Sequence, residues 1–377
     1  MGIPKIIALF CKLKLTSHFK RISPHIHYLL IFIIPVKFMY KKRVLSGVQP
    51  TGELHIGNYL GALKQWSENQ DHYDNLFCIV DLHALTIPEN IKPKELFSKT
   101  REIAAWYIAS GIDPKKSSIF IQSHVKEHTE LCWILNCVTP VGWLEKMAQY
   151  KSKSQNAHSI STGLLDYPVL QAADILLYQT EIVPVGEDQK QHVELTRDIA
   201  IRFNTLFGNV FKVPEHLIRQ SGARIMGLDN PEVKMSKSIG REKTGHSIGL
   251  LDDIDVIKKT IMTAVTDNNK EVRFEHASKG IQNLLTIYEV LTGFSKDEMA
   301  SHFDGKGYVF LKNSIADVVI SAIQPVQEKF RLIIKEKNYL DEVLLEGAGR
   351  ARNVACHTMK RVRELTGLLD TSECLVL

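Results

Sequence analysis

The sequence predicts an α/β protein in which a doubly wound parallel sheet is followed by an all-α C-terminal domain. From residue 44 to residue 207, short apolar segments alternate with longer segments whose apolar residues recur with the period of a helix. Such alternation is typical of parallel strands joined by crossover helices. After about residue 228 only helical patterns occur. The 377 residues, 44% of them hydrophobic and 24% charged, have the composition of a globular protein with two or three domains.

Four short segments have the composition of strands that are buried on both faces. They are largely apolar rather than alternating, which is the pattern of a parallel sheet covered by helices. The expected strands are residues 44–48, 76–80, 118–122 and 182–185. The first of them ends in the turn Gln49-Pro50-Thr51-Gly52.

Helices are expected where apolar residues recur at three- and four-residue spacing. The first is expected at Ile56–Gln70. The others in the sheet region are 93–110, 129–138, 141–153, 167–178 and 187–207, and those in the C-terminal region are 252–265, 281–291, 315–334 and 350–365. This order of elements indicates a Rossmann-like catalytic domain over residues 43–227. An N-terminal extension (1–42) precedes it, and a helical domain (228–377) follows.

The positive charge of the chain is concentrated at its N-terminus. Residues 1–43 contain nine of the 47 lysines and arginines and none of the 42 acidic residues, so the rest of the chain has an excess of four acidic residues. The net charge of +5 is therefore no evidence that the folded domains bind nucleic acid. The six cysteines form no CxxC pair and no zinc-binding spacing, and no protein-bound metal is expected.

Residues 1–38 have three interpretations. Their apolar segment Tyr28–Val36 has nine residues, whereas a membrane span needs about 20. A secretory signal does not fit, because no small-x-small cleavage site follows. The segment is an organellar targeting peptide, a structural extension, or the result of a start assigned too far upstream of Met39. The protein is accordingly expected in the cytoplasm, or in an organelle matrix if residues 1–38 are a transit peptide.

A first candidate site follows the first strand. His55-Ile56-Gly57-Asn58 stands at the start of a helix, and the carboxyl end of a strand is where ligands bind in a doubly wound sheet. A helix start offers N–H groups to phosphate, and Gly57 permits close approach to the backbone. By itself this motif fits an ordinary capped helix equally well.

A second candidate site lies near the end of the sheet domain. Lys234-Met235-Ser236-Lys237-Ser238 places two lysines and two hydroxyl groups within five residues. Such a cluster can neutralise the charge that develops as pyrophosphate leaves a triphosphate. In isolation, a solvated basic loop would be the simpler interpretation.

Together the two motifs carry a resemblance that neither carries alone. HIGN after the first strand and KMSKS after the sheet domain are, in this order, similar to the signatures of class I aminoacyl-tRNA synthetases. Further segments closely resemble the bacterial-type tryptophanyl-tRNA synthetases. These are Leu45–Trp66, Phe77–Thr86, Tyr167–Tyr178, Ile182–Thr196, which contains the characteristic VPVGEDQKQH, and Ala223–Met226. The resemblance covers nearly all of residues 43–368 and leaves residues 1–40 without a counterpart.

The resemblance implies a role for each matching residue. Residues similar to those that bind ATP are Gln49, His55, Gly57, Asn58, Gly186, Asp188, Gln189, Ile225, Lys234, Met235, Ser236 and Lys237. Of these His55, Asn58, Lys234 and Lys237 are expected to be catalytic, with Lys153 as a further phosphate-handling lysine. Residues similar to those around tryptophan are Asp174, Tyr167, Gln171, Val183 and Val185. Two positions depart from the pattern, since many relatives have Thr in place of His55 and some have Met in place of Gln171.

Asp174 is also notable from the residues alone. It is a single carboxylate within the apolar segment Val169–Tyr178. A carboxylate in such a place is exposed, ion-paired, or placed to accept a hydrogen bond from a ligand. With the resemblance, the leading interpretation is that Asp174 accepts the indole N–H of tryptophan. A buried acceptor of this kind rejects analogues that lack the donor.

The activity that the resemblance implies is the ligation of tryptophan to its tRNA. The carboxylate of tryptophan attacks the α-phosphorus of ATP, and a ribose hydroxyl at the 3′ end of tRNA(Trp) then attacks the adenylate. The implied ligands and partners are L-tryptophan, ATP with Mg²⁺, tRNA(Trp) and a second copy of the chain in a homodimer, with no membrane. Catalysis would rest on positioning and on stabilisation of phosphate charge.

Two other functions stay open on the sequence. One is a related enzyme, a tyrosyl-tRNA synthetase or more remotely another nucleotidylyltransferase. The other is an RNA-binding paralogue without activity, which the intact KMSKS motif and Asp174 disfavour.

Some further patterns carry less chemistry. Gly240–Ser247 and Gly347–Gly349 are incomplete nucleotide-binding motifs without a preceding strand. The four tryptophans are expected in the core. The last helix carries a basic cluster that is either a solvated face or a tRNA contact; it consists of Arg350, Arg352, Lys360, Arg361 and Arg363.

We predict that residues 1–38 are dispensable for catalysis. The family-like part of the chain begins near Arg43, and the charge of the preceding segment differs from that of the rest. A shortened chain that begins at Met39 should therefore fold and aminoacylate tRNA like the full chain, as measured by initial rates under matched conditions. Loss of activity in a folded shortened chain would make the extension part of the enzyme.

Overall fold

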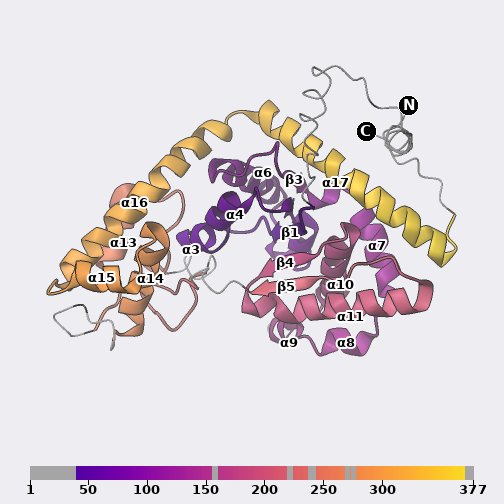
Figure 1. Cartoon of the computed structure of the whole chain (residues 1–377), viewed down its shortest axis with the longest axis horizontal. Coiled ribbons are helices and arrows are strands. Elements are labelled where there is room, and N and C mark those ends of the chain that lie inside the picture. Colours follow the sequence, from indigo (N-terminus) through magenta and orange to yellow (C-terminus); the bar gives the residue numbers. More distant parts are fainter. Residues whose placement is uncertain are drawn as a thin grey trace, which may run out of the picture. The chain divides into compact units, whose positions relative to one another are not determined.

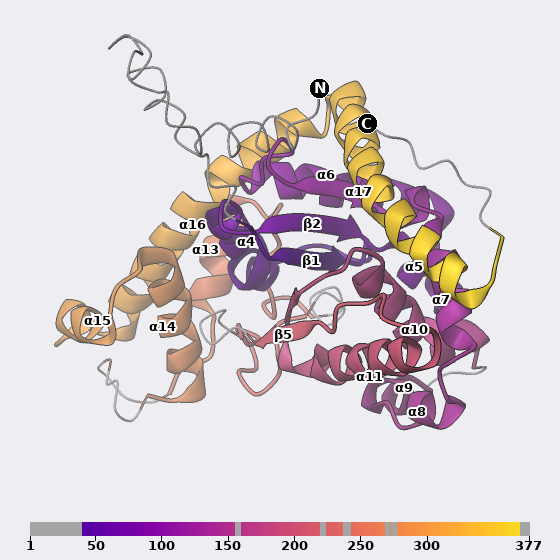
Figure 2. The same ribbon diagram turned by 45° about the vertical axis from the view of Figure 1, so that its right-hand side comes forward.

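Five parallel strands form the single sheet around which the sheet domain is built. The computed structural model describes residues 40–154, 160–218, 224–236, 243–267, 272 and 277–369. The strands are β1 (Arg43–Val48), β2 (Asp74–Ile79), β3 (Ser118–Ile121), β4 (Ile182–Val185) and β5 (Glu215–Ile218). Their order in the sheet is β3-β2-β1-β4-β5 and every neighbouring pair is parallel (Figure 2). The predicted doubly wound parallel sheet is confirmed.

The edge strand β5 was not expected from the sequence. Its residues are Glu-His-Leu-Ile, of which Glu215 is exposed and His216 is half-buried. An edge strand has only one neighbour, so it lacks the continuous apolar pattern that identifies the strands in the middle of the sheet.

Helices cover both faces of the sheet. In the sheet domain these are α3 (Ile56–Asn58), η1 (Tyr59–Leu63), α4 (Lys64–Asn69), α5 (Asp81–Ala84), η2 (Pro88–Asn90), α6 (Pro93–Ala109), η3 (Gln122–His124), α7 (Glu127–Asn136), α8 (Val141–Glu145), α9 (Ala148–Ser154), α10 (Thr162–Leu177), η4 (Glu187–Gln189) and α11 (Lys190–Phe207). Phe77 and Ile79 of β2 belong to the hydrophobic cluster that contains α6, and Leu76 and Cys78 belong to the one that contains α7, α10 and α11. Successive residues of β2 thus pack on opposite layers.

Several helices differ from their expected bounds. The segment 141–153, expected as one helix, forms α8 and α9, the helices expected from 315 and 350 begin at Tyr308 and Lys337, and the helix Lys296–Phe303 was not expected. Two further differences have local reasons. The expected helix Ile56–Gln70 contains a wider turn, η1, where the N–H of Lys64 donates to the carbonyl of Tyr59, five residues back. The helix expected from Tyr167 begins instead at Thr162, where the side chain of Ser161 accepts a hydrogen bond from the N–H of Leu164.

The C-terminal part is helical, as predicted. It contains α13 (Ile254–Met262), α14 (Lys279–Thr292), α15 (Lys296–Phe303), α16 (Tyr308–Ile333) and α17 (Lys337–Thr366). The junction with the sheet domain is made by α16 and α6, where the rings of Trp106 and Phe330 stack with centroids 4.0 Å apart. Figure 1 shows α13–α16 grouped at one end of the molecule, while α17 runs back over the sheet domain.

By length and composition, α16 could span a membrane. Its buried residues include Leu311, Ile315, Val319 and Phe330, which recur along one side of the helix. That side packs against α13, α14 and α6. This one-sided burial is that of an amphipathic helix packed on a folded domain.

The last helix packs directly on the outer strand β3. A β-carbon placed on Gly347 would overlap the backbone carbonyl of Ile119, so only glycine permits this approach. Arg350 donates to the carbonyls of Pro114 and Ser117, at 2.7 and 3.1 Å. The helix therefore covers an edge that would otherwise be open to other strands.

The basic cluster of α17 is largely occupied by bonds within the protein. Arg352 donates to the carbonyl of His124, and Arg363 makes two bonds to the carboxylate of Glu130, at 2.7 and 2.5 Å. With Arg350, three of the five residues thus hold α17 against the sheet domain, although Arg350 and Arg352 are also exposed to solvent. Among the tryptophans, Trp133 contradicts the expected core position, since it is 71% exposed.

We predict opposite effects for two neighbouring glycines of α17. Gly347→Ala should lower the free energy of unfolding by about 2 kcal/mol, because a backbone carbonyl cannot move aside as a flexible side chain can. Gly349→Ala is the matched control: its added methyl group meets no atom within 4 Å, so it should gain up to about 1 kcal/mol from helix propensity. Urea denaturation of both variants measures the difference, and equal midpoints would show that α17 does not lie this close to β3.

Candidate active site

A cavity opens between β1 and β4. From β1 the strands β2 and β3 are added on one side and β4 and β5 on the other, so the strand order reverses here. The helices after β1 contribute to one hydrophobic layer and α11, after β4, to the other. The two strands are paired only at Val44 and Ile182. Beyond this pair the strands line a cavity of about 750 Å³ with Leu45–Gln49 on one side and Val183–Gly186 on the other. Such a crevice at a topological switch point is the usual ligand site of a doubly wound sheet.

Most of the residues singled out in the sequence meet at this cavity. Those that line it are Gln49, Asn58, Tyr167, Gln171, Asp174, Val183, Val185, Gly186, Asp188, Gln189 and Ser236. Five others do not line it: His55, Gly57, Ile225, Lys234 and Met235. Gly57 and Met235 are next in sequence to the lining residues Asn58 and Ser236. Lys237 lies outside the described residues, as does the side chain of Lys153.

The first motif begins the helix after β1. The backbone N–H of His55 donates to Oδ1 of Asn58 at 3.1 Å, which fixes the carboxamide at the edge of the cavity. A β-carbon on Gly57 would lie 2.9 Å from Nδ1 of His55 and 3.5 Å from Cβ of Ile225. The glycine therefore lets the His55 ring and Ile225 lie against the helix start.

The start of the second motif pairs with the segment Ile225–Met226 in antiparallel orientation. Met226 and Lys234 form an isolated β-bridge, and the N–H of Met235 donates to the carbonyl of Ile225 at 3.0 Å. The side chain of Asn283 in α14 accepts from the N–H of Met226 at 2.8 Å and donates to its carbonyl at 3.0 Å. Helix α14 thus holds the segment that brings Ser236 to the cavity, while Lys234 is exposed.

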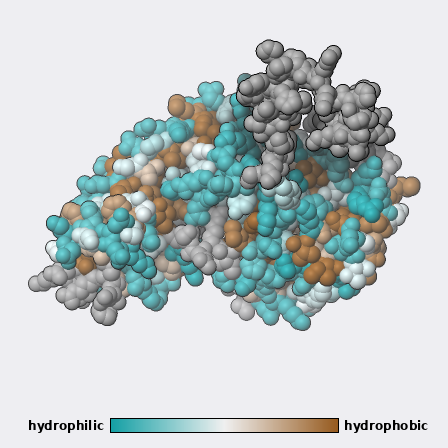
Figure 3. All heavy atoms as spheres, viewed as in Figure 1, coloured by the Kyte–Doolittle hydropathy of each residue, from teal (hydrophilic) through white to brown (hydrophobic). Residues whose placement is uncertain are grey.

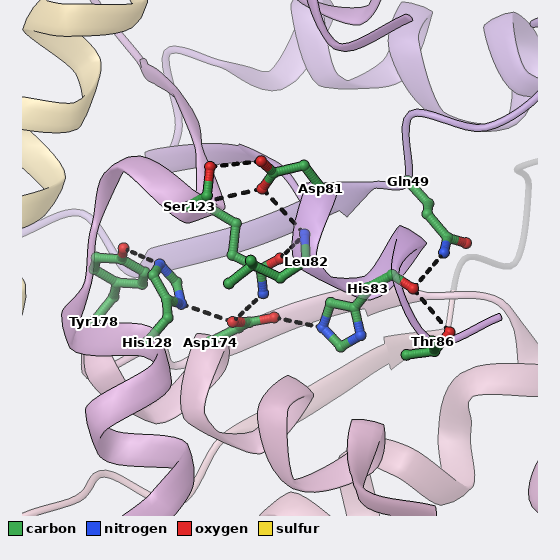
Figure 4. A network of polar contacts seen from close by, with 10 residues as sticks. Gln49, Asp81, Leu82, His83, Thr86, Ser123, His128, Asp174 and Tyr178 are labelled. Carbon is green, nitrogen blue, oxygen red and sulfur yellow. Dashed lines mark hydrogen bonds and ion pairs between the residues drawn. The ribbon is translucent and has the colours of Figure 1, made fainter. Parts of the chain in front are cut away.

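Asp174 is the centre of a buried hydrogen-bond network (Figure 4). Its side chain is nearly inaccessible. Oδ1 accepts from Nδ1 of His128 and from Nε2 of Gln122, both at 2.7 Å, and Oδ2 accepts from Nε2 of His83 at 2.9 Å. Because a carboxylate only accepts, each of these nitrogens carries the hydrogen. Burial by itself would raise the pKa of Asp174, but electrostatic attraction and hydrogen bonds from the side chains of His128 and His83 hold this pKa below its ordinary value, so the group is ionised.

Three members of this network were missed in the sequence. His83 is on α5 directly after β2, and Gln122 directly follows β3. Carboxyl ends of parallel strands meet at one edge of a sheet, so this rule could have identified both residues. His128 lies on α7, and no local pattern relates it to Asp174, 46 residues further on.

Two further polar side chains of the cavity, Gln49 and Tyr167, are held by hydrogen bonds. Nε2 of Gln49 donates to the carbonyl of His83 at 2.8 Å. The hydroxyl of Tyr167 is 3.0 Å from Nε2 of His192, and burial raises the pKa of Tyr167 to about 12, so the phenol is neutral. Among the residues that the structure describes, no group of three or more His, Cys, Asp and Glu side chains could hold a metal ion.

This combination of features defines a class of protein. A Rossmann-type sheet with its crevice at β1 and β4, a glycine-containing helix start after β1, and a serine- and lysine-containing segment held by the helical domain are the features of a class I aminoacyl-tRNA synthetase. A family model described as "tRNA synthetases class I (W and Y)" matches residues 40–324. The chain belongs to this family.

Relatives that are more than 30% identical to this chain include tryptophan enzymes from several bacteria. The tryptophan--tRNA ligase of Wolinella succinogenes is 53% identical over 332 residues, which cover 88% of this chain and all of that protein. Among solved structures, tryptophanyl-tRNA synthetase from Mycoplasma pneumoniae matches with a TM-score of 0.79 and 33% identity, covering 88% of this chain and 99% of its own. The Campylobacter jejuni enzyme, complexed with ADP and tryptophan, matches with a TM-score of 0.75 and 36% identity, covering 86% of this chain and all of its own.

Proposed function

We propose that this chain is a tryptophan–tRNA ligase that uses the cavity between β1 and β4 for both tryptophan and ATP. It activates tryptophan to tryptophanyl-adenylate with release of pyrophosphate, and then transfers tryptophan to the 3′ end of tRNA(Trp). The observation that carries the proposal is the ionised, buried Asp174, which lines a cavity otherwise bordered by apolar and neutral polar side chains at this end. The activity would take place in the cytoplasm, or in an organelle matrix if residues 1–38 direct import.

The tryptophan subsite is at the Asp174 end of the cavity. A carboxylate has about four acceptor positions, and three of these are used by His83, Gln122 and His128. The remaining position is on Oδ2, the oxygen that accepts only one bond. The indole of tryptophan has one donor, its N–H, which fits this single position. Tyr167, Gln171, Val183 and Val185 would surround the ring and the amino-acid backbone.

The ATP subsite is at the other end, between the two motifs. Asn58, whose Oδ1 is bonded to the backbone, keeps its amide N–H groups for phosphate or ribose. Since the Met235 N–H and the Ile225 carbonyl bond to each other, the adenine would be read by the Ile225 N–H and the Met235 carbonyl. Gly186, Asp188 and Gln189 would hold the ribose and the α-amino group, with Gln49, His55 and Gly57 near the phosphates.

The chemistry needs no covalent enzyme intermediate. The chain holds the carboxylate of tryptophan near the α-phosphorus and excludes water, which supplies the entropic part of catalysis. Lys234 and Lys237, with Ser236, would offset the negative charge that develops on pyrophosphate. Mg²⁺ would neutralise charge on the triphosphate, since it commonly binds through substrate phosphates and water.

We also propose that the chain forms a homodimer through the surface of α7, α8 and α11. Four large apolar residues are exposed there, Trp133 (71%), Val141 (57%), Leu206 (55%) and Ile201 (49%). Ile201 and Leu206 line a groove of about 470 Å³ together with Trp143 and Arg202, and Figure 3 shows hydrophobic residues gathered over α11. A second copy is the expected occupant, as the resemblance implies.

For the dimer, we predict that Ile201→Glu halves the mass measured by sedimentation, because the new charge would have to be buried. Leu345→Glu is the matched control, since Leu345 is 73% exposed on α17 and outside this surface. A monomeric wild type would refute the proposal.

The function is tested by amino-acid-dependent ATP–pyrophosphate exchange over all twenty amino acids. The expected result is exchange with tryptophan and Mg²⁺-ATP only. Exchange with tyrosine would assign the chain to the other branch of the family, and exchange with no amino acid would favour an RNA-binding protein without activity.

A sharper prediction concerns Asp174. Asp174→Asn should weaken the binding of tryptophan by roughly 1.5–3 kcal/mol and lower kcat/KM accordingly. The substitution removes the charge and turns an N–H₂ group toward existing donors. Asp174→Ala should reduce the preference for tryptophan over an analogue with sulfur in place of the indole nitrogen. The KM for ATP should hardly change in either variant. A folded Asp174→Ala variant that keeps the wild-type preference would mean that the indole is read elsewhere.

A further inference from the structure

The two oxygens of Asp174 have different surroundings. His128 and Gln122, which bond to Oδ1, are completely buried and lie outside the lining of the cavity. His83, which bonds to Oδ2, lines the cavity together with Asp174. The carboxylate is therefore anchored from behind through Oδ1 and presents Oδ2 to the cavity (Figure 4).

His128 is itself held in one orientation and one tautomer. Its Nδ1–H donates to Asp174, and its Nε2 is 2.6 Å from the hydroxyl of Tyr178. Burial raises the pKa of Tyr178 well above its ordinary value, so this hydroxyl keeps its proton and can donate it to Nε2. The imidazole also stacks on Phe120, with ring centroids 6.2 Å apart. These contacts leave the ring little freedom to turn away from Asp174.

We propose that His128, oriented by Tyr178, is a positioning residue that sets the selectivity of the site for a ligand with an indole N–H. By holding Oδ1, it keeps the free acceptor position of Oδ2 directed into the cavity and keeps the carboxylate charged. His128 does not touch the ligand in this arrangement, so it acts through Asp174 alone. This inference rests on the proposed function, since it assumes that tryptophan occupies the cavity.

The charge of Asp174 depends on its donors because every other influence opposes it. Burial favours the neutral acid. The titratable groups around it are His83, His128, the thiols of Cys78 and Cys132, and the phenol of Tyr178. Asp81 lies near Cys78, Asp166 near Cys132 and Glu127 near Tyr178. Asp81 and Glu127 are acidic and cannot replace the lost donor. Without His128, the pKa of Asp174 should rise, and the ionised form should be lost as the pH falls toward the acid side.

The experiment compares three substitutions in the full chain. His128→Phe keeps a ring but removes the donor, His128→Asn keeps an N–H donor near the position of Nδ1, and Tyr178→Phe removes only the hydroxyl behind the imidazole. For each variant, kcat/KM in pyrophosphate exchange is measured for tryptophan and for the sulfur analogue between pH 5.5 and 8.5. The KM for ATP and the melting temperature report general damage.

We expect His128→Phe to lower the tryptophan-to-analogue ratio at least tenfold. Its kcat/KM for tryptophan should also fall with decreasing pH, whereas the value for the analogue and the wild-type profile change little. His128→Asn should restore most of the ratio, and Tyr178→Phe should shift it in the same direction by a smaller factor. His246→Phe is the matched control, because His246 is another buried imidazole bonded to a carboxylate, Asp229, at 2.6 Å; it should leave the ratio unchanged.

Three results would overturn the inference. One is a folded His128→Phe variant with the wild-type ratio and pH profile; another is a His128→Asn variant as poor as His128→Phe; the third is a ratio that falls equally in His246→Phe. If His128→Phe does not fold, the test rests on the other two variants. A Tyr178→Phe ratio below the wild-type value, with His128→Asn close to wild type, would support the inference, and a wild-type ratio in Tyr178→Phe would overturn it. Failure of the proposed function is separate, because it would appear as a wild type without tryptophan-dependent exchange.

Discussion

The arrangement of the site depends on one buried charge. Asp174 lies on α10, in the middle of the sheet domain, and its carboxylate is kept ionised by donors from three separate elements. These elements are α5 after β2, η3 after β3, and α7. The strand order brings the ends of β2 and β3 to the same edge as β1, so the donors converge on α10 from one side. A charge left here without partners would oppose folding.

The polar links between these elements make the site a rigid unit. Oε1 of Gln122 accepts from the N–H of Leu82 at 3.1 Å, and Asp81 accepts from the N–H and hydroxyl of Ser123. These hydrogen bonds join the short helix α5 to η3, and both elements also bond to Asp174 (Figure 4). A donor that is held in place needs little reorganisation when a ligand arrives, which is the basis of preorganised electrostatics.

The helical part of the chain supports both ends of the cavity by different contacts. At the nucleotide end, Asn283 of α14 fixes the segment that carries Met235 and Ser236. At the amino-acid end, α17 packs on β3 at Gly347. Its Arg363 makes two hydrogen bonds to Glu130 on α7, the helix that carries His128. The last helix of the chain therefore stabilises the element behind the tryptophan subsite.

The sequence by itself determined the strands β1 to β4, the helical C-terminal part and the two motifs. These features follow from local periodicity and from short motifs, which are contained within a few consecutive residues. The candidate role of Asp174 came from the resemblance to a known family. The tertiary structure alone decided that β5 joins the sheet, that His128 stands behind Asp174, and that Arg350 and Arg363 hold α17 in place. Each of these depends on hydrogen bonds or pairing between distant residues, up to 236 positions apart for Arg350 and Pro114. A side chain that bonds to a remote partner leaves no periodic mark in its own segment, because only folding brings the two together.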